Sequence, residues 1–192
     1  MGQRLIMNIY EYEGNSEPIL NVYYHWSAYT RSAYEEAKIF LTEYNRITRT
    51  GNLIIDCLNA LESAGARVCE PEESEALFKD LNFEAATDSI NRNNGIIAYT
   101  ESGKEDNEAY GEGTLNVYMR SETIANYCTW ATDEDEILDS EIDPESIPLI
   151  DQDLEYISFN DLENTLMMLN NMVRSRVYIY KTPNNEYISL IE

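Results

Sequence analysis

The sequence predicts an α+β fold in which helices pack on a mostly antiparallel sheet, within a single domain of residues 1–192. Two observations predict this class. Apolar residues alternate at a period of two near the N-terminus, and they then recur at helical spacing before short strand-like segments return. Hydrophobic residues make up 43% of the chain, which is enough for a core, and an acidic elaboration interrupts the pattern at about 132–157.

The N-terminus predicts a β-hairpin. Leu5, Met7 and Ile9 alternate with polar residues, and residues 19–26 are rich in strand-forming side chains. Residues 13–18 lie between these two segments and contain the Gly, Asn, Ser and Pro that favour a turn. The two strands are therefore expected to pair, which brings the start of the first beside the end of the second.

Three helices are expected after the hairpin. A capping box formed by Ser32 and Glu35 predicts the start of the first, and Gly51 follows its end. The second covers residues 54–64, and a short third helix covers residues 72–81.

The second half of the chain predicts more strands and one further helix. Strands are expected at residues 95–99, 114–119 and 126–131, with residues 101–113 forming a polar loop. Ser158 and Asp161 then frame a helix start, and a hairpin across Pro183 closes the chain with residues 177–181 and 187–191. The predicted order is ββααα–βββ–α–ββ.

The charge balance is extreme for a chain of this length. There are 36 acidic and 13 basic residues, and the formal net charge is -23. Such a surface repels nucleic acids and anionic membranes and attracts basic proteins, so direct nucleic-acid binding is excluded. Two explanations stay open: a charge that serves solubility or a salt-adapted cytoplasm, and a charge that imitates a polyanion.

The acidic residues concentrate in the C-terminal half. No Lys or Arg occurs from Ser121 to Val173, and aliphatic residues interrupt the acids regularly, which favours a segment anchored along the fold over a free tail. A fixed row of carboxylates resembles duplex DNA, which carries one charge per roughly 1.7 Å of axis. The predicted partner-binding surface comprises Asp133, Glu134, Asp135, Glu136, Asp139, Glu141, Asp143, Glu145, Asp151, Asp153 and Glu155.

Calcium binding is the rival interpretation of these acids. In the frame that starts at Asp139, Pro144 replaces the required Gly of an EF-hand and Ile150 replaces the closing Glu. In the frame that starts at Asp151, Leu162 occupies the closing position. Both frames fail, and we expect neither a metal nor a cofactor.

A second candidate site is a polar cluster near the N-terminus, where a strand meets a helix start suited to anions. Arginines there can pair with a phosphate or a carboxylate, and the aromatic side chains can stack on a base. The alternative is that His25 and Trp26 form a hydrogen-bonded core pair. The possible ligand pocket comprises Gln3, Arg4, His25, Trp26, Tyr29, Thr30 and Arg31.

Two short motifs in this cluster carry a resemblance. Met1-Gly2-Gln3-Arg4, followed by Tyr24-His25-Trp26-Ser27-Ala28-Tyr29-Thr30, resembles a family of small bacterial and phage proteins. These open with Met-Gly-(Gln or Thr)-Arg and carry a His-Trp-x-(Gly or Ala)-Tyr motif. The resemblance covers roughly the first 45 residues. It implies a phage or mobile-element origin and no particular reaction.

Catalysis is not expected. His25 is the only histidine, and the sequence has no phosphate-binding loop, dinucleotide fingerprint, zinc-protease motif or marked nucleophile. The predicted location is the cytoplasm of a bacterial host. The three cysteines lie outside any CxxC motif, and the sequence shows neither an apolar segment of membrane-spanning length nor a signal peptide.

The leading functional hypothesis is a phage-type anti-defence protein. Its acidic surface would inhibit a basic, nucleic-acid-binding host protein, such as a nuclease or a defence complex, by acting as a DNA mimic. One alternative is a protein that sequesters a nucleotide signal in the N-terminal pocket. A second alternative is an acidic accessory protein without mimicry.

Overall fold

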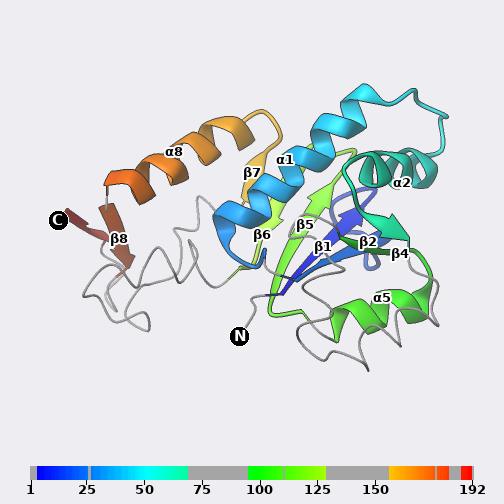
Figure 1. Ribbon diagram of the computed structural model, residues 1–192, viewed down its shortest axis with the longest axis horizontal. Helices are drawn as coiled ribbons and strands as arrows, with labels where there is room; N and C mark the ends of the chain where they lie inside the picture. Colours follow the sequence, from blue (N-terminus) through cyan, green and yellow to red (C-terminus); the bar gives the residue numbers. More distant parts are fainter. Residues whose placement is uncertain are drawn as a thin grey trace.

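The computed structural model describes residues 4–25, 27–68, 95–109, 111–128, 156–175, 177–181 and 187–191, with side chains described as far as residue 170. These residues form a seven-stranded sheet, helices on both of its faces and a separate two-stranded hairpin (Figure 1). The predicted α+β class is therefore confirmed.

Seven strands of the described residues make up the large sheet. They are β1 (Leu5–Tyr10), β2 (Leu20–Tyr24), β3 (Arg67–Val68), β4 (Ile96–Ala98), β5 (Gly113–Tyr118), β6 (Thr123–Asn126) and β7 (Tyr156–Ser158). The helices are α1 (Thr30–Arg46), α2 (Leu53–Ser63), α5 (Glu101–Glu108) and α8 (Leu162–Ser175). The closing hairpin pairs β8 (Val177–Lys181) with β9 (Tyr187–Ile191), as predicted.

The sheet is mixed, so the predicted mostly antiparallel sheet is wrong. Its strand order is β3-β4-β2-β1-β5-β6-β7. β1 pairs antiparallel with β2, as the predicted hairpin requires, but it pairs parallel with β5 along its other edge, and β3 pairs parallel with β4. The alternation of apolar residues along a strand specifies which face is buried, and it leaves the partner strand open.

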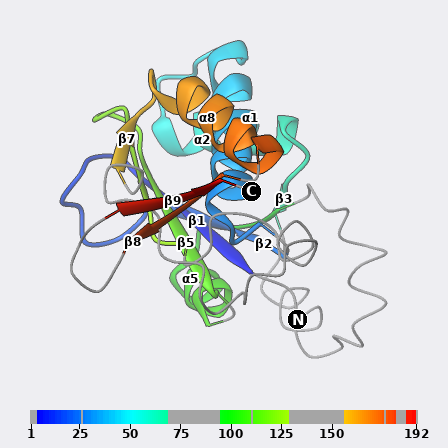
Figure 2. The same cartoon turned by 90° about the vertical axis from the view of Figure 1, so that its left-hand side faces the viewer.

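One face of the sheet is apolar and is covered by α1, α2 and α8 (Figures 1 and 2). Leu5, Met7 and Ile9 of β1 belong to the same buried cluster as Ala37 and Phe40 of α1. Both sets follow the predicted periodicities, because a period of two fills one sheet face and a period near four fills one helix face. The core therefore lies between this face of the sheet and helices α1, α2 and α8.

Helix α1 begins earlier than predicted. Its first residue is Thr30, so Ser32 lies inside the helix and does not cap it. Tyr29 occupies the N-cap without a side-chain cap bond, and its carbonyl accepts a hydrogen bond from Ala33 N at 2.7 Å. Thr30 is fully buried and its Oγ1 accepts from Asn126 Nδ2 at 2.7 Å. Packing against β6 thus overrides the local capping signal.

The opposite face carries α5, where a polar loop at residues 101–113 was expected. Thr100 caps this helix by accepting a bond from Gly103 N at 3.2 Å. A Cβ on Gly103 would lie 3.2 Å from Ala98 Cβ, so glycine lets the helix approach β4 closely. A helix at 101–108 and strands at β3 and β7 also mean that the predicted element order is not confirmed.

Several other predictions are confirmed. α2 is followed by Gly65, which has a φ of +97°. Ser158 Oγ donates to Asp161 Oδ2 at 2.6 Å just before α8 begins.

The strand expected at 126–131 instead runs through β6 and ends at Asn126. The third helix expected at 72–81 lies outside the described residues. Among those residues, no helix has the length and apolar character required to cross a membrane.

Candidate functional site

The hairpin brings part of the predicted N-terminal cluster together. Leu5 pairs with Tyr24, which places Arg4 and His25 side by side at one end of strands β1 and β2. His25 is buried, and its Nδ1 shares a hydrogen bond of 2.8 Å with the Tyr23 hydroxyl. Burial, and next the Arg4 guanidinium, lower the pKa of His25, so a neutral ring is favoured there. Gln3 and Trp26, also part of the predicted pocket, lie outside the described residues.

The other members of this cluster connect α1 to the sheet. Tyr29 and Thr30 are buried, and Arg31 is partly buried at the first turn of α1. The Arg4 backbone is held in turn by Glu112, since Arg4 N donates to Glu112 Oε2 at 3.0 Å and Arg4 O accepts from Glu112 N at 2.8 Å. These contacts give the cluster a structural role, and its use as a ligand pocket stays a prediction.

A buried carboxyl group lies near this end of the strands, and it was not predicted from the sequence. Glu36 of α1 is 7% exposed and accepts a hydrogen bond from Ser27 Oγ at 2.9 Å. Burial raises the pKa of Glu36 to about 7, while the Ser27 bond opposes the rise and Glu35 adds to it. The available signal was position: Glu36 lies three residues after Ala33 and beside Ala37, on the buried face of α1.

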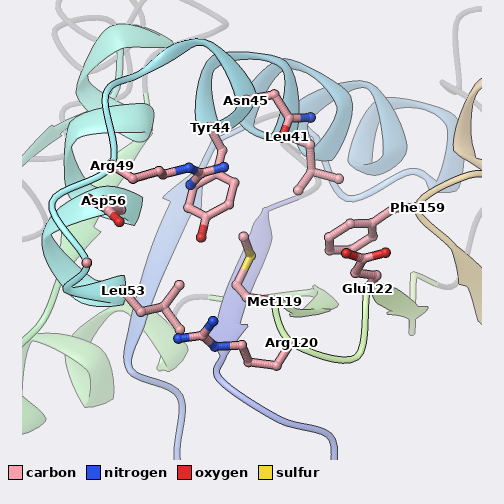
Figure 3. A pocket seen from close by; sticks show the side chains of 11 residues that line it. Leu41, Tyr44, Asn45, Arg49, Leu53, Asp56, Met119, Arg120, Glu122 and Phe159 are labelled. Carbon is pink, nitrogen blue, oxygen red and sulfur yellow. The ribbon is translucent and has the colours of Figure 1, made fainter.

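At the opposite end of the sheet lies a cleft of about 520 Å³ (Figure 3). It is lined by the C-terminal part of α1, the α1–α2 loop, the start of α2, the β5–β6 turn and the residue after β7. Its volume falls within the roughly 300–1,000 Å³ that small-molecule sites occupy. None of its lining residues was predicted as a site, because they come from three separate parts of the sequence, residues 41–56, residues 119–122 and Phe159.

Two arginines lie on one side of the cleft. Arg49 stacks on Tyr44, with its Cζ 3.2 Å from the ring centroid. Arg120 reaches in from the β5–β6 turn, and its Nε lies 3.7 Å from Glu11 Oε1. Burial and the Cys57 thiol raise the pKa of Tyr44, and both arginines oppose this rise. The Tyr44 hydroxyl is therefore a neutral hydrogen-bonding group within the field of two guanidinium groups.

The loop that carries Arg49 is held by specific bonds. Asp56 is buried, and its Oδ1 accepts from Thr50 N and Thr50 Oγ1, both at 2.7 Å. These bonds lower the pKa of Asp56. Gly51 adopts a φ of +86°, and Asn52 caps α2 by accepting from Ile54 N at 3.1 Å. The Asp56 charge is thus used to fix the loop.

The other side of the cleft is apolar with a carboxylate at its rim. Phe159 and Glu122 lie opposite Arg49 in Figure 3, with Met119 between them. Glu122 has a φ of 54°, a left-handed conformation that costs a non-glycine residue roughly 1–2 kcal/mol. Its carbonyl accepts from Phe159 N at 2.8 Å, which fixes the turn to the end of β7.

The predicted acidic surface lies outside the described residues, from Asp133 through Glu155. Among the described residues, the densest run of acids is on α5, where Glu101, Glu105, Asp106 and Glu108 are exposed. The described residues as a whole hold no group of three or more His, Cys, Asp or Glu that could bind a metal ion.

The described cysteines are packing residues. Cys57 and Cys128 are buried, and burial raises the pKa of each thiol to about 12. Both are therefore protonated at neutral pH, and a thiol in this state is a poor nucleophile. Cys69 lies outside the described residues.

Comparisons of the chain with protein-family models, curated proteins and solved structures gave no match, so the function is inferred from the chain's own residues.

Proposed function

We propose that the protein is a phage-type anti-defence protein, a non-catalytic inhibitor that binds a basic, nucleic-acid-binding host protein in the bacterial cytoplasm. The observation that carries the proposal is the net charge of -23, concentrated where no basic residue interrupts the acids. A partner with a basic groove would be attracted over roughly a Debye length, about 8–10 Å at physiological salt.

Three of the described cations are engaged by the protein itself. Lys38 pairs with Glu163, and Arg46 pairs with Glu43 at 2.7 Å. Lys104 Nζ donates to Pro18 O at 2.9 Å, even though α5 offers several exposed carboxylates. Their charges are already included in the net charge of -23, which leaves the carboxylates in excess. The resemblance of the N-terminal motifs to phage proteins agrees with this function.

Charge reversal tests the proposal. Changing Asp133, Glu134, Asp135 and Glu136 to lysine is expected to reduce capture of basic host proteins from a lysate by at least ten-fold, because several carboxylates of the binding surface change sign together. The matched control reverses Glu101, Glu105, Asp106 and Glu108 on α5, which changes the net charge equally at another place. Equal losses in the two variants would contradict a localised binding surface and favour a charge that serves solubility.

A second candidate function is sequestration of a nucleotide signal at the N-terminal cluster. The observation that favours it is the placement of Arg4 beside His25 at the end of β1 and β2, where α1 begins. Arg4→Ala is the variant that tests it, since it would abolish a nucleotide-induced rise in melting temperature.

A further inference from the structure

We propose that the cleft between Arg49, Arg120 and Glu122 binds a nucleotide, with the phosphate at the two arginines and a purine base, preferably guanine, at Phe159 and Glu122. This site lies at the opposite end of the sheet from the N-terminal cluster. Nucleotide binding here does not depend on the inhibitor function of the acidic surface.

The cationic side of the cleft fits a phosphate. Figure 3 shows the guanidinium groups of Arg49 and Arg120 on the same side of the cleft. Arg49 is preorganised by its stacking on Tyr44, and the loop behind it is fixed by Asp56. Arg120 is half exposed, and among the described residues its ion pair is the 3.7 Å contact of Nε with Glu11. Both arginines line the cleft, and both act on the Tyr44 hydroxyl. Guanidinium groups bind phosphate oxygens bidentately, so the phosphate is expected on this side of the cleft.

The apolar middle of the cleft fits a planar base. Leu41 and Met119 are buried nearly completely, and Phe159 is partly buried, so together they offer apolar surface beside the phosphate position. Bases of any sequence stack favourably on aromatic rings. The cleft volume of about 520 Å³ is sufficient for a nucleoside monophosphate.

The rim opposite the arginines selects the base. Glu122 is exposed and lies beside Phe159, where a carboxylate can accept two hydrogen bonds. Guanine presents an N–H and an amino group side by side on its pairing edge, whereas adenine presents a single amino donor there. A carboxylate at this position therefore favours guanine. The left-handed turn at Glu122 holds the side chain at the rim, which is a reason for this residue to tolerate the strain.

Titration of the full chain with GMP, AMP, guanosine and inorganic phosphate tests the site. GMP is expected to raise the melting temperature more than any of the other three compounds. Arg120→Ala is expected to weaken GMP binding at least ten-fold, because charge-assisted bonds to the phosphate are lost. Arg120 is exposed, so this variant is expected to fold. Glu122→Gln is expected to remove the preference for GMP over AMP while AMP binding is retained.

A control locates the site. Arg46→Ala removes an arginine that pairs with Glu43 outside the cleft. This variant is expected to bind GMP as the unmodified protein does. Three results would each overturn the assignment. GMP does not bind, or it binds equally to Arg120→Ala and the unmodified protein, or it has the same effect as inorganic phosphate. Capture of a basic partner should not change in Arg120→Ala, so the two functions fail independently.

Discussion

Replacing Glu36 with glutamine is expected to stabilise the protein at about pH 8 by about 3 kcal/mol. In the folded protein, burial raises the pKa of Glu36 from 4.5 to about 7. The folded state therefore binds a proton more tightly than the unfolded state does. The stabilisation from that proton is complete below pH 4.5 and is lost as the pH rises to about 7. Glutamine keeps an acceptor for Ser27 Oγ and has no charge to bury.

Urea unfolding from about pH 4.5 to pH 8.5 measures this effect. The difference in unfolding free energy between Glu36→Gln and the unmodified protein should grow with pH and level off above pH 7. Glu35→Gln is the matched control, because it removes the same charge from the adjacent, exposed position. A difference that does not vary with pH would show that Glu36 is solvated in the folded state.

Asn107→Ala is expected to destabilise the protein by about 2–3 kcal/mol, because it leaves buried acceptors without donors. Asn107 is 1% exposed, and its Nδ2 donates to Asn21 Oδ1 at 2.9 Å and to Ile96 O at 3.2 Å. Asn21 Nδ2 in turn donates to Lys104 O at 3.2 Å. This network joins α5 to β2 and β4.

Urea unfolding and amide hydrogen exchange measure the consequence. Backbone amides of α5 should lose protection in Asn107→Ala more than those of α1, since the lost bonds hold only α5 to the sheet. Glu108→Ala, an exposed change one residue later on the same helix, should have an effect below about 0.5 kcal/mol. Unchanged stability in Asn107→Ala would mean that apolar packing alone holds α5.

The asparagine network also explains why part of the fold escaped sequence reasoning. Residues 101–113 have a loop-like composition. The helix α5 forms there because Asn107 hydrogen-bonds to β2 and β4 and because Gly103 packs closely against Ala98. The parallel pairing of β1 with β5 joins strands more than a hundred residues apart, so no local signal marks it. The β1–β2 hairpin and α2 were predictable, because turn residues and periodicity lie within each segment.

The candidate sites divide in the same way. Placing Arg4 beside His25 required only the hairpin, which local sequence predicts. The cleft of Arg49 and Arg120 required the tertiary arrangement of α1, α2 and the β5–β6 turn. Glu36 was not recognised because a glutamate on a helix is ordinarily solvated. The packing of α1 on the sheet buries it, and this packing is tertiary.

The salt dependence of partner binding tests the inhibitor function most directly. The protein is immobilised, a captured basic host protein is titrated at about 50 and 200 mM salt, and duplex DNA is added as a competitor. A polyanion mimic should lose at least ten-fold in affinity over this range, and DNA should displace the partner because both occupy one groove. An affinity that is equal at the two salt concentrations, with a partner that DNA does not displace, would contradict it.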